Sequence, residues 1–161
     1  MIFVTVGSQL PFDRLVSTVD RWAAERPNAE IFGQVGDTPS PPKSFESVST
    51  MSPEEYQRRF SEADLVVAHA GMGTIIAALE MRQPLLMLPR LARLKESRND
   101  NQVGTVRHFR NFEQFEVVDS ESEIPARLDH MLANLQSYRT ASDQFGVGDG
   151  LIAAIREFVN T

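Results

Sequence analysis

The chain has 161 residues, of which 42% are hydrophobic and 24% are charged, and these values exclude a disordered or fibrous protein. It contains no cysteine, which excludes a disulfide framework, a thiolate metal site and a cysteine nucleophile. Its net charge of −6 argues against general nucleic-acid binding.

Sequence features linked to membranes and export are absent. No apolar run approaches the roughly 18 residues of a membrane span, so the sequence predicts no span of its own. The first six residues are apolar without a preceding basic region, so no signal peptide is expected. Together with the lack of cysteine, this pattern favours a cytoplasmic protein.

Short apolar runs alternate along the chain with segments of helical periodicity. Residues 1–6 form the first such run, and Leu15, Val16, Val19 and Trp22 follow at helical spacing. We expect strands at residues 1–6, 30–35, 45–50, 65–68, 84–88 and 115–118, and helices at residues 13–25, 53–63, 74–81, 99–109, 122–135 and 151–159.

Two local signals mark boundaries between these elements. Ser52 and Pro53, followed by Glu55, predict a helix start with a capping box. Three prolines within residues 39–42 predict a loop. Alternation of strands and helices predicts one α/β domain over residues 1–161, a Rossmann-like parallel sheet with helices on both faces. In such sheets, ligands bind at the carboxyl ends of the strands.

The loop after residues 65–68 carries the strongest functional signal, His69-Ala70-Gly71-Met72-Gly73-Thr74. The first N–H groups of the following helix point into this turn and favour an anion, which the glycines leave room for. A dinucleotide fingerprint would need glycine at Ile76, and the Gly-Lys-Ser/Thr of a P-loop is missing. Two interpretations stay open: a loop that binds the diphosphate of a nucleotide sugar, and a tight turn without a ligand.

Histidines and basic residues allow similar alternatives. His69 either donates to a phosphate or acts as a base, or it is an ordinary buried polar residue. His108 and His130 lie on predicted helices, and the three histidines have no metal-ligand spacing. One loop is basic and either binds an anion or is a solvated loop; it contains Arg90, Arg93, Lys95 and Arg98.

A polar run opens the helix after this basic loop. Asn99 is a candidate cap, and Asn101 and Gln102 carry amides suited to sugar hydroxyls. Ordinary capping chemistry is the alternative for all three.

Four segments in this order resemble the C-terminal, donor-binding domain of family 28 glycosyltransferases, over nearly the whole chain. More closely, the chain is similar to the small subunit of two-part enzymes that build exopolysaccharides or lipid-linked oligosaccharides. The segments are residues 4–13, beginning Val-Thr-Val-Gly-Ser-Gln, residues 69–74, residues 84–90 and residues 99–102.

The resemblance implies a role for individual residues in a donor site. It places Gly7, Ser8 and Gln9 near the diphosphate, Met51 and Ser52 at the uracil ring, and Asn101 and Gln102 at the donor sugar. Residues His69, Ala70, Gly71, Met72, Gly73 and Thr74 match the diphosphate loop. Arg90, in the basic loop, is a separate candidate for stabilising the negative charge of the diphosphate.

The chain also departs from the family pattern. Relatives carry a ribose-binding glutamate where this chain has Ala77, and Glu80, one turn further along, is a candidate substitute. Relatives often have histidine where this chain has Asn101, which leaves the donor sugar open.

The implied fold is the C-terminal half of a GT-B enzyme, and the implied reaction transfers a sugar from a UDP-sugar to a lipid-linked acceptor. Glucuronic acid, galactose and N-acetylglucosamine are the candidate sugars. The reaction is expected to need no cofactor and no bound metal. His69 is a candidate catalytic base. The resemblance also implies a membrane-anchored, acceptor-binding partner subunit, which would recruit this chain to the inner face of the membrane.

Two other functions were weighed against this one. The alternative is a non-catalytic nucleotide-sugar-binding or regulatory module, which the missing ribose glutamate favours. An NAD-dependent oxidoreductase is disfavoured by Ile76 and by the lack of a proton-relay set.

Overall fold

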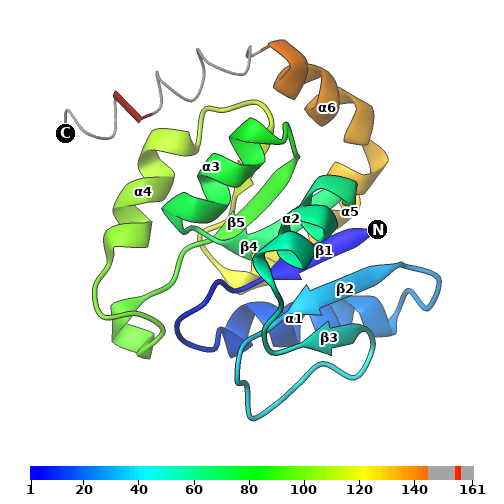
Figure 1. Cartoon of the computed structure of the whole chain (residues 1–161), viewed down its shortest axis with the longest axis vertical. Coiled ribbons are helices and arrows are strands. Elements are labelled where there is room, and N and C mark those ends of the chain that lie inside the picture. The colour runs from blue at the N-terminus through cyan, green and yellow to red at the C-terminus, as the bar shows by residue number, and fades with distance from the viewer. Residues whose placement is uncertain (145–154, 157–161) are drawn as a thin grey trace.

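The computed structural model describes residues 1–144 and 155–156. Their strands form one six-stranded parallel sheet in the order β3-β2-β1-β4-β5-β6 (Figure 1). The strands are β1 (Ile2–Thr5), β2 (Ile31–Gln34), β3 (Glu46–Val48), β4 (Leu65–His69), β5 (Leu85–Leu88) and β6 (Phe115–Val117).

Helices cover both faces of this sheet, as right-handed crossovers between parallel strands require (Figure 1). The α-helices are α1 (Asp13–Ala24), α2 (Pro53–Glu62), α3 (Met72–Glu80), α4 (Asn101–Phe109), α5 (Ile124–Ala133) and α6 (Leu135–Gln144). Two short 3-10 helices, η1 (Ala92–Leu94) and η2 (Glu121–Glu123), lie in the loops after β5 and β6.

Alternating side chains of the strands divide the core into two layers. Ile2 and Val4 of β1 pack on the face covered by α1 and α5, together with Trp22 and Leu128. Phe3 points the other way, into the layer beneath α2, α3 and α4. The central strands are therefore apolar on both faces, which is why they appear in the sequence as continuous apolar runs.

The strand order reverses between β1 and β4, because the chain leaves β1 toward β2 and later returns to the other side of β1. Such a reversal leaves a crevice outside the carboxyl ends of the two strands, where ligands bind in open α/β sheets. The loops after β1 and β4 meet at this position.

Most of the expected elements are present, with shifted ends. Helix α3 begins at Met72 rather than Thr74, and α4 begins at Asn101 with Asp100 at its N-cap. Asn99 still contributes to this start, because its side-chain oxygen accepts from the N–H of Asn101 at 3.1 Å. The helix predicted at residues 122–135 is present as α5, with the short η2 before it. The sequence reasoning missed α6, which follows it.

Two further expectations have mixed outcomes. Ser52 caps α2 as predicted, accepting from the N–H of Glu55 at 3.2 Å, but the capping box is wrong because the Glu55 carboxylate pairs with Arg58 and Arg59. The helix expected at residues 151–159 lies outside the described residues except for residues 155–156, which are helical. Over the part of the chain that the structure describes, every helix is too short or too polar to cross a bilayer.

Candidate functional site

A cavity of about 710 Å³ opens at the carboxyl edge of the sheet, beside the reversal between β1 and β4. Loops after four different strands line it. Among the predicted site residues, those that line the cavity are Gly7, Ser8, Gln9, Met51, His69, Gly71, Gly73, Thr74, Arg90 and Gln102.

The N-terminus of α3 faces this cavity. Its N-cap is Gly71, which has no side chain to accept from the first N–H groups, and no other described side chain caps them. A methyl group added at Gly73 would meet no other atom within 4 Å, so this position opens on free space. The helix start therefore presents uncapped N–H groups and the positive end of its dipole to the cavity.

His69, the last residue of β4, has its imidazole wedged between two glycines. A side-chain carbon built at Gly71 would lie 2.2 Å from His69 Nε2, and one built at Gly7 would lie 2.6 Å from Cε1. Gly7 also has a φ of +76°, a conformation that glycine adopts without strain. These two glycines make room for the ring, whereas Gly73 keeps space in the cavity.

Burial controls the charge of this histidine. It lowers the pKa of His69 to about 4, and the positive charge of Arg90 acts in the same direction. The ring is therefore neutral at pH 7. Its Nδ1 is buried without a hydrogen-bond partner among the described residues.

Gln102, in the first turn of α4, joins two of the cavity loops. Its Oε1 accepts from the backbone N–H groups of Ala70 and Arg90, each at 3.1 Å. Because the oxygen is held by two donors, the orientation of the amide is fixed and its NH₂ group is the part left for a ligand. Gln102 thus offers the cavity hydrogen-bond donors and no acceptor.

Arg90 was predicted to face an anion, but it serves mainly as a buried link between loops. Its Nη2 donates to the carbonyls of Val6 and Leu10, and its Nη1 donates to those of Pro11 and Glu96. Its guanidinium carbon lies 4.8 Å from the ring centre of Phe12, and only 4% of the residue is exposed. Most of its donors are therefore already used within the protein.

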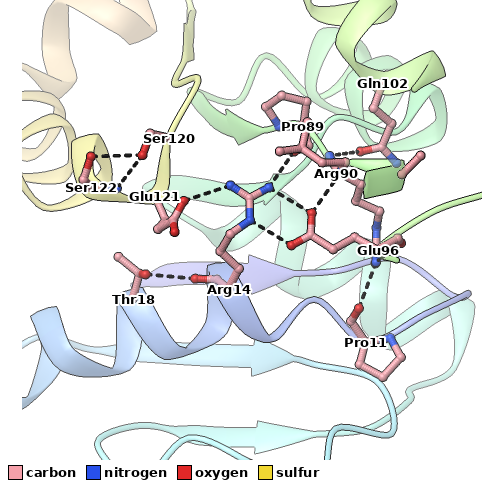
Figure 2. A network of polar contacts seen from close by, with 12 residues as sticks. Pro11, Arg14, Thr18, Pro89, Arg90, Glu96, Gln102, Ser120, Glu121 and Ser122 are labelled. Carbon is pink, nitrogen blue, oxygen red and sulfur yellow. Dashed lines mark hydrogen bonds and ion pairs between the residues drawn. The ribbon is translucent and has the colours of Figure 1, made fainter. Parts of the chain in front are cut away.

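A second arginine supports the same loop (Figure 2). Arg14 of α1 forms a bidentate pair with Glu96 at 2.8 and 2.9 Å, donates to Glu121 at 3.0 Å and donates to the carbonyl of Pro89 at 3.0 Å. The Glu96 carboxylate also accepts from the N–H of Leu91. Glu96 lines the cavity, but its negative charge is compensated by Arg14.

Gln34 at the end of β2 fixes the floor of the cavity. Its side-chain oxygen accepts from the Thr5 hydroxyl at 2.9 Å, and its amide donates to the carbonyls of Gly7 and Ser49. The sequence reasoning missed Gln34, and also Tyr56 and Glu96, which line the cavity as well. A polar residue at the end of an apolar strand was the available signal for Gln34.

Five predicted site residues do not line the cavity, and one of them is the buried Ala70. Ser52 is occupied in capping α2, and Met72 lies in the first turn of α3. Glu80 is exposed at the opposite end of α3 from the cavity, so its position does not favour the proposed substitution for the ribose glutamate. Asn101 is exposed at the start of α4.

Chemically, this arrangement suits an anionic ligand with an adjoining ring. Uncapped N–H groups and the Gln102 amide are donors for phosphate or sugar oxygens. Tyr56, Met51 and Pro53 give one side of the cavity an apolar surface for a flat group. No group of three or more potential metal ligands occurs within the described residues.

Comparisons with known proteins agree with this architecture. The model of the glycosyltransferase family 28 C-terminal domain matches residues 1–154. The fold is similar to MurG of Acinetobacter baumannii (TM-score 0.63, 16% identity, 99% of this chain and 49% of that one). It is also similar to a UDP-GlcNAc 2-epimerase of Neisseria meningitidis bound to UDP-GlcNAc (TM-score 0.64, 10% identity, 99% of this chain and 44% of that one).

The fold is similar to a third solved structure, a UDP-glucose: anthocyanidin 3-O-glucosyltransferase in complex with UDP (TM-score 0.59, 14% identity, 99% of this chain and 39% of that one). At these identities the likeness shows the fold, which is that of the C-terminal halves of GT-B enzymes. This chain spans less than half the length of each of these proteins. No curated protein matches the chain.

Proposed function

Because the chain belongs to the glycosyltransferase family 28 C-terminal domain family, whose model covers residues 1–154, we propose that it binds the UDP-sugar donor of a glycosyl transfer to a lipid-linked acceptor. The observation that carries this proposal is the uncapped N-terminus of α3, which faces a cavity at the strand-order reversal.

In the proposed complex, the donor diphosphate lies at the start of α3. Its oxygens accept from the N–H groups of residues 72–74 and from the Thr74 hydroxyl. As the sugar leaves, negative charge grows on the β-phosphate, and the fixed N–H dipoles stabilise it without reorganising. The uracil ring lies against Met51 on the apolar side of the cavity, and the sugar lies near the Gln102 amide.

The acceptor hydroxyl also needs a base. His69 was the candidate, but a pKa of about 4 makes it a weak base at neutral pH. We assign to it the filling of the space between Gly7 and Gly71, and we assign the base to the acceptor-binding partner.

We base the proposed partner on the share of the fold that this chain supplies. The chain covers 49%, 44% and 39% of the three solved proteins compared above, which is about the share of one half of a GT-B enzyme. We propose that the other half is a membrane-anchored, acceptor-binding subunit that holds this chain at the inner face of the membrane. The donor sugar is of the glucuronic acid, galactose or N-acetylglucosamine class.

Nucleotide binding by the chain alone tests the donor site. We expect UDP to shift the amide signals of residues 71–74 in a ¹⁵N-correlated NMR spectrum, and to bind at least about tenfold more tightly than ADP, a difference of about 1.4 kcal/mol. Shifts confined to other surfaces, or equal affinity for both nucleotides, would contradict a UDP-sugar site. Binding without any transfer in the presence of a partner would favour the non-catalytic module.

A further inference from the structure

Two exposed leucines lie on adjacent loops at the edge of the cavity. Leu10 follows β1 and is 43% exposed, and Leu94 ends η1 and is 44% exposed. Within the described residues, Ile155 is the only other exposed large aliphatic side chain. Neither leucine lines the donor cavity, so binding of a nucleotide gives no reason for their exposure.

Arg90 holds these two loops together. It donates to the carbonyl of Leu10 through Nη2 and to the carbonyl of Glu96 through Nη1. The loop after β1 and the loop that carries η1 accordingly run side by side (Figure 1). Leu10 and Leu94 therefore lie on two neighbouring loops that a buried residue holds together.

Exposed cations surround Leu94 on its loop. Arg93, Lys95 and Arg98 are all exposed. Of the acidic neighbours, Glu96 pairs with Arg14, whereas the Asp100 carboxylate accepts from the N–H of Ala92 and keeps its negative charge beside these three cations. In a chain of net charge −6, this is a local surplus of positive charge. We call Leu10, Arg93, Leu94, Lys95 and Arg98 the rim patch.

The backbone of the rim patch has a left-handed conformation at Lys95. Lys95 has a φ of +59° and a ψ of 26°, the left-handed conformation that glycine and asparagine adopt more readily. It ends η1 in a sharp turn stabilised by the bond from its N–H to Ala92. A lysine in this conformation carries a conformational cost.

We propose that the rim patch contacts an anionic lipid surface. Leucine side chains enter the boundary between headgroups and acyl chains, and the flanking cations pair with lipid phosphates. A lipid surface fits the patch better than a protein partner, because the two leucines lie outside the cavity, whereas the main contacts of protein interfaces fill pockets. This inference does not depend on the identity of the donor.

Vesicle co-sedimentation of the full chain tests the proposal. We expect sedimentation with vesicles of phosphatidylcholine and phosphatidylglycerol in equal parts, and at least several-fold less with phosphatidylcholine alone. Binding should be lost in 0.5 M salt, because the screening length falls to about 4 Å at that ionic strength. The variants Leu10→Ser/Leu94→Ser and Arg93→Ser/Lys95→Ser should each reduce sedimentation several-fold.

Matched controls distinguish an effect of the rim patch from an effect of net charge and from a loss of folding. Arg58→Ser/Arg110→Ser removes two exposed positive charges on α2 and after α4, and we expect it to bind vesicles like the unaltered chain. All variants should keep their UDP binding, which is read out independently of lipid. No sedimentation, equal binding to both vesicle types, or equal loss in the control variant would overturn the proposal. Loss of a protein partner by the patch variants, without vesicle binding, would assign the patch to that partner instead.

Discussion

Gly71 and Gly73 stand two positions apart in one loop, yet their missing side chains serve different neighbours. Gly71 leaves room for the His69 ring, whereas Gly73 faces open space in the cavity. From the sequence alone, both glycines were interpreted as leaving room for a phosphate. Spacing along the chain does not reveal which neighbour a missing side chain accommodates, so this division needed the structure.

Substitution of Gly73 isolates the role of this open space. A Cβ at Gly73 meets no neighbouring atom within 4 Å, so we expect Gly73→Val to fold normally. It should lose UDP binding by at least about tenfold, since the added bulk covers the N–H groups of α3. Gly104→Val in α4 is the matched control, because a Cβ there also meets no neighbouring atom within 4 Å. Calorimetric titration of both variants makes the comparison, and equal UDP affinities would contradict the role of Gly73.

Two substitutions of Gln102 separate its structural oxygen from its free amide. Gln102→Glu keeps an oxygen for the N–H groups of Ala70 and Arg90, so its free energy of unfolding should change by less than about 1 kcal/mol. Gln102→Leu leaves both donors unpaired and should cost about 2 kcal/mol. Both should weaken donor binding, because neither presents an NH₂ group. If Gln102→Glu binds a UDP-sugar normally, the amide has no part in recognition.

His69 makes stability depend on pH. Its folded-state pKa of about 4 lies below the ordinary 6.5, so the unfolded chain takes up this proton first as the pH falls. The stabilising contribution is fully present above pH 6.5 and is lost between pH 6.5 and 4, by up to about 3 kcal/mol. When the free energy of unfolding is measured by urea denaturation and plotted against pH over this range, it should fall less steeply for His69→Ala than for the unaltered chain. The same dependence on pH in both proteins would mean that the ring is not buried in its neutral form.

At the scale of elements, three loops are connected by two side chains. Arg90 joins the loop after β1 to the loop after β5, and Gln102 joins the loop after β5 to the loop after β4. Both side chains use backbone partners that lie far away in the sequence. The sequence indicated a cation and an amide near the site, but it could not show that carbonyls some 80 residues away would take up the guanidinium.

Arg90→Lys tests this link. A lysine ammonium cannot reproduce the planar fork that meets four carbonyls, so we expect a loss of about 2 to 4 kcal/mol in the free energy of unfolding. Arg93 in the same loop is exposed, so Arg93→Lys should change the free energy of unfolding by less than about 0.5 kcal/mol. Urea denaturation compares the two. A small loss at Arg90 would show that the loops are held by other contacts.

The elements that sequence reasoning found are those with strong periodicity. Strand β4 and helix α1 are apolar or amphipathic throughout, and their packing agrees with their local preferences. Helix α6 was missed because its sequence is mostly polar and its buried residues, such as Tyr138, are few. The hydroxyl of Tyr138 donates to Glu116, a contact between α6 and β6 that a local pattern does not contain.

At the scale of the whole molecule, the cavity lies at the carboxyl edge of a single parallel sheet. The fold class and a site at the carboxyl ends of the strands could be predicted, because parallel strands place these ends together, whereas the strand order and its reversal between β1 and β4 needed the structure. The sequence predicted His69 as a candidate base, but it could not show that burial lowers the pKa of this histidine to about 4, which makes it a weak base.

We proposed that this chain binds the donor and that a partner subunit supplies the base, and turnover with and without the partner tests this division. We expect the purified chain to transfer almost no sugar from any UDP-sugar, and transfer to appear when the product of the adjacent open reading frame is co-expressed. An assay against UDP-glucuronic acid, UDP-galactose and UDP-N-acetylglucosamine, with a lipid-linked acceptor, makes the measurement. Robust turnover by the chain alone would exclude the two-subunit arrangement.

The bonds that Gln102 accepts have a consequence for the exchange of backbone hydrogens with deuterium. The amides of Ala70 and Arg90 lie in loops but are hydrogen-bonded, so they should exchange slowly even in the free chain. The amides of residues 72–74, two to four positions further on, are uncapped and should exchange rapidly until a nucleotide covers them. The slow amide of Ala70 would thus lie within a few residues of the fast amides of residues 72–74, and added ligand would slow the exchange of residues 72–74 only.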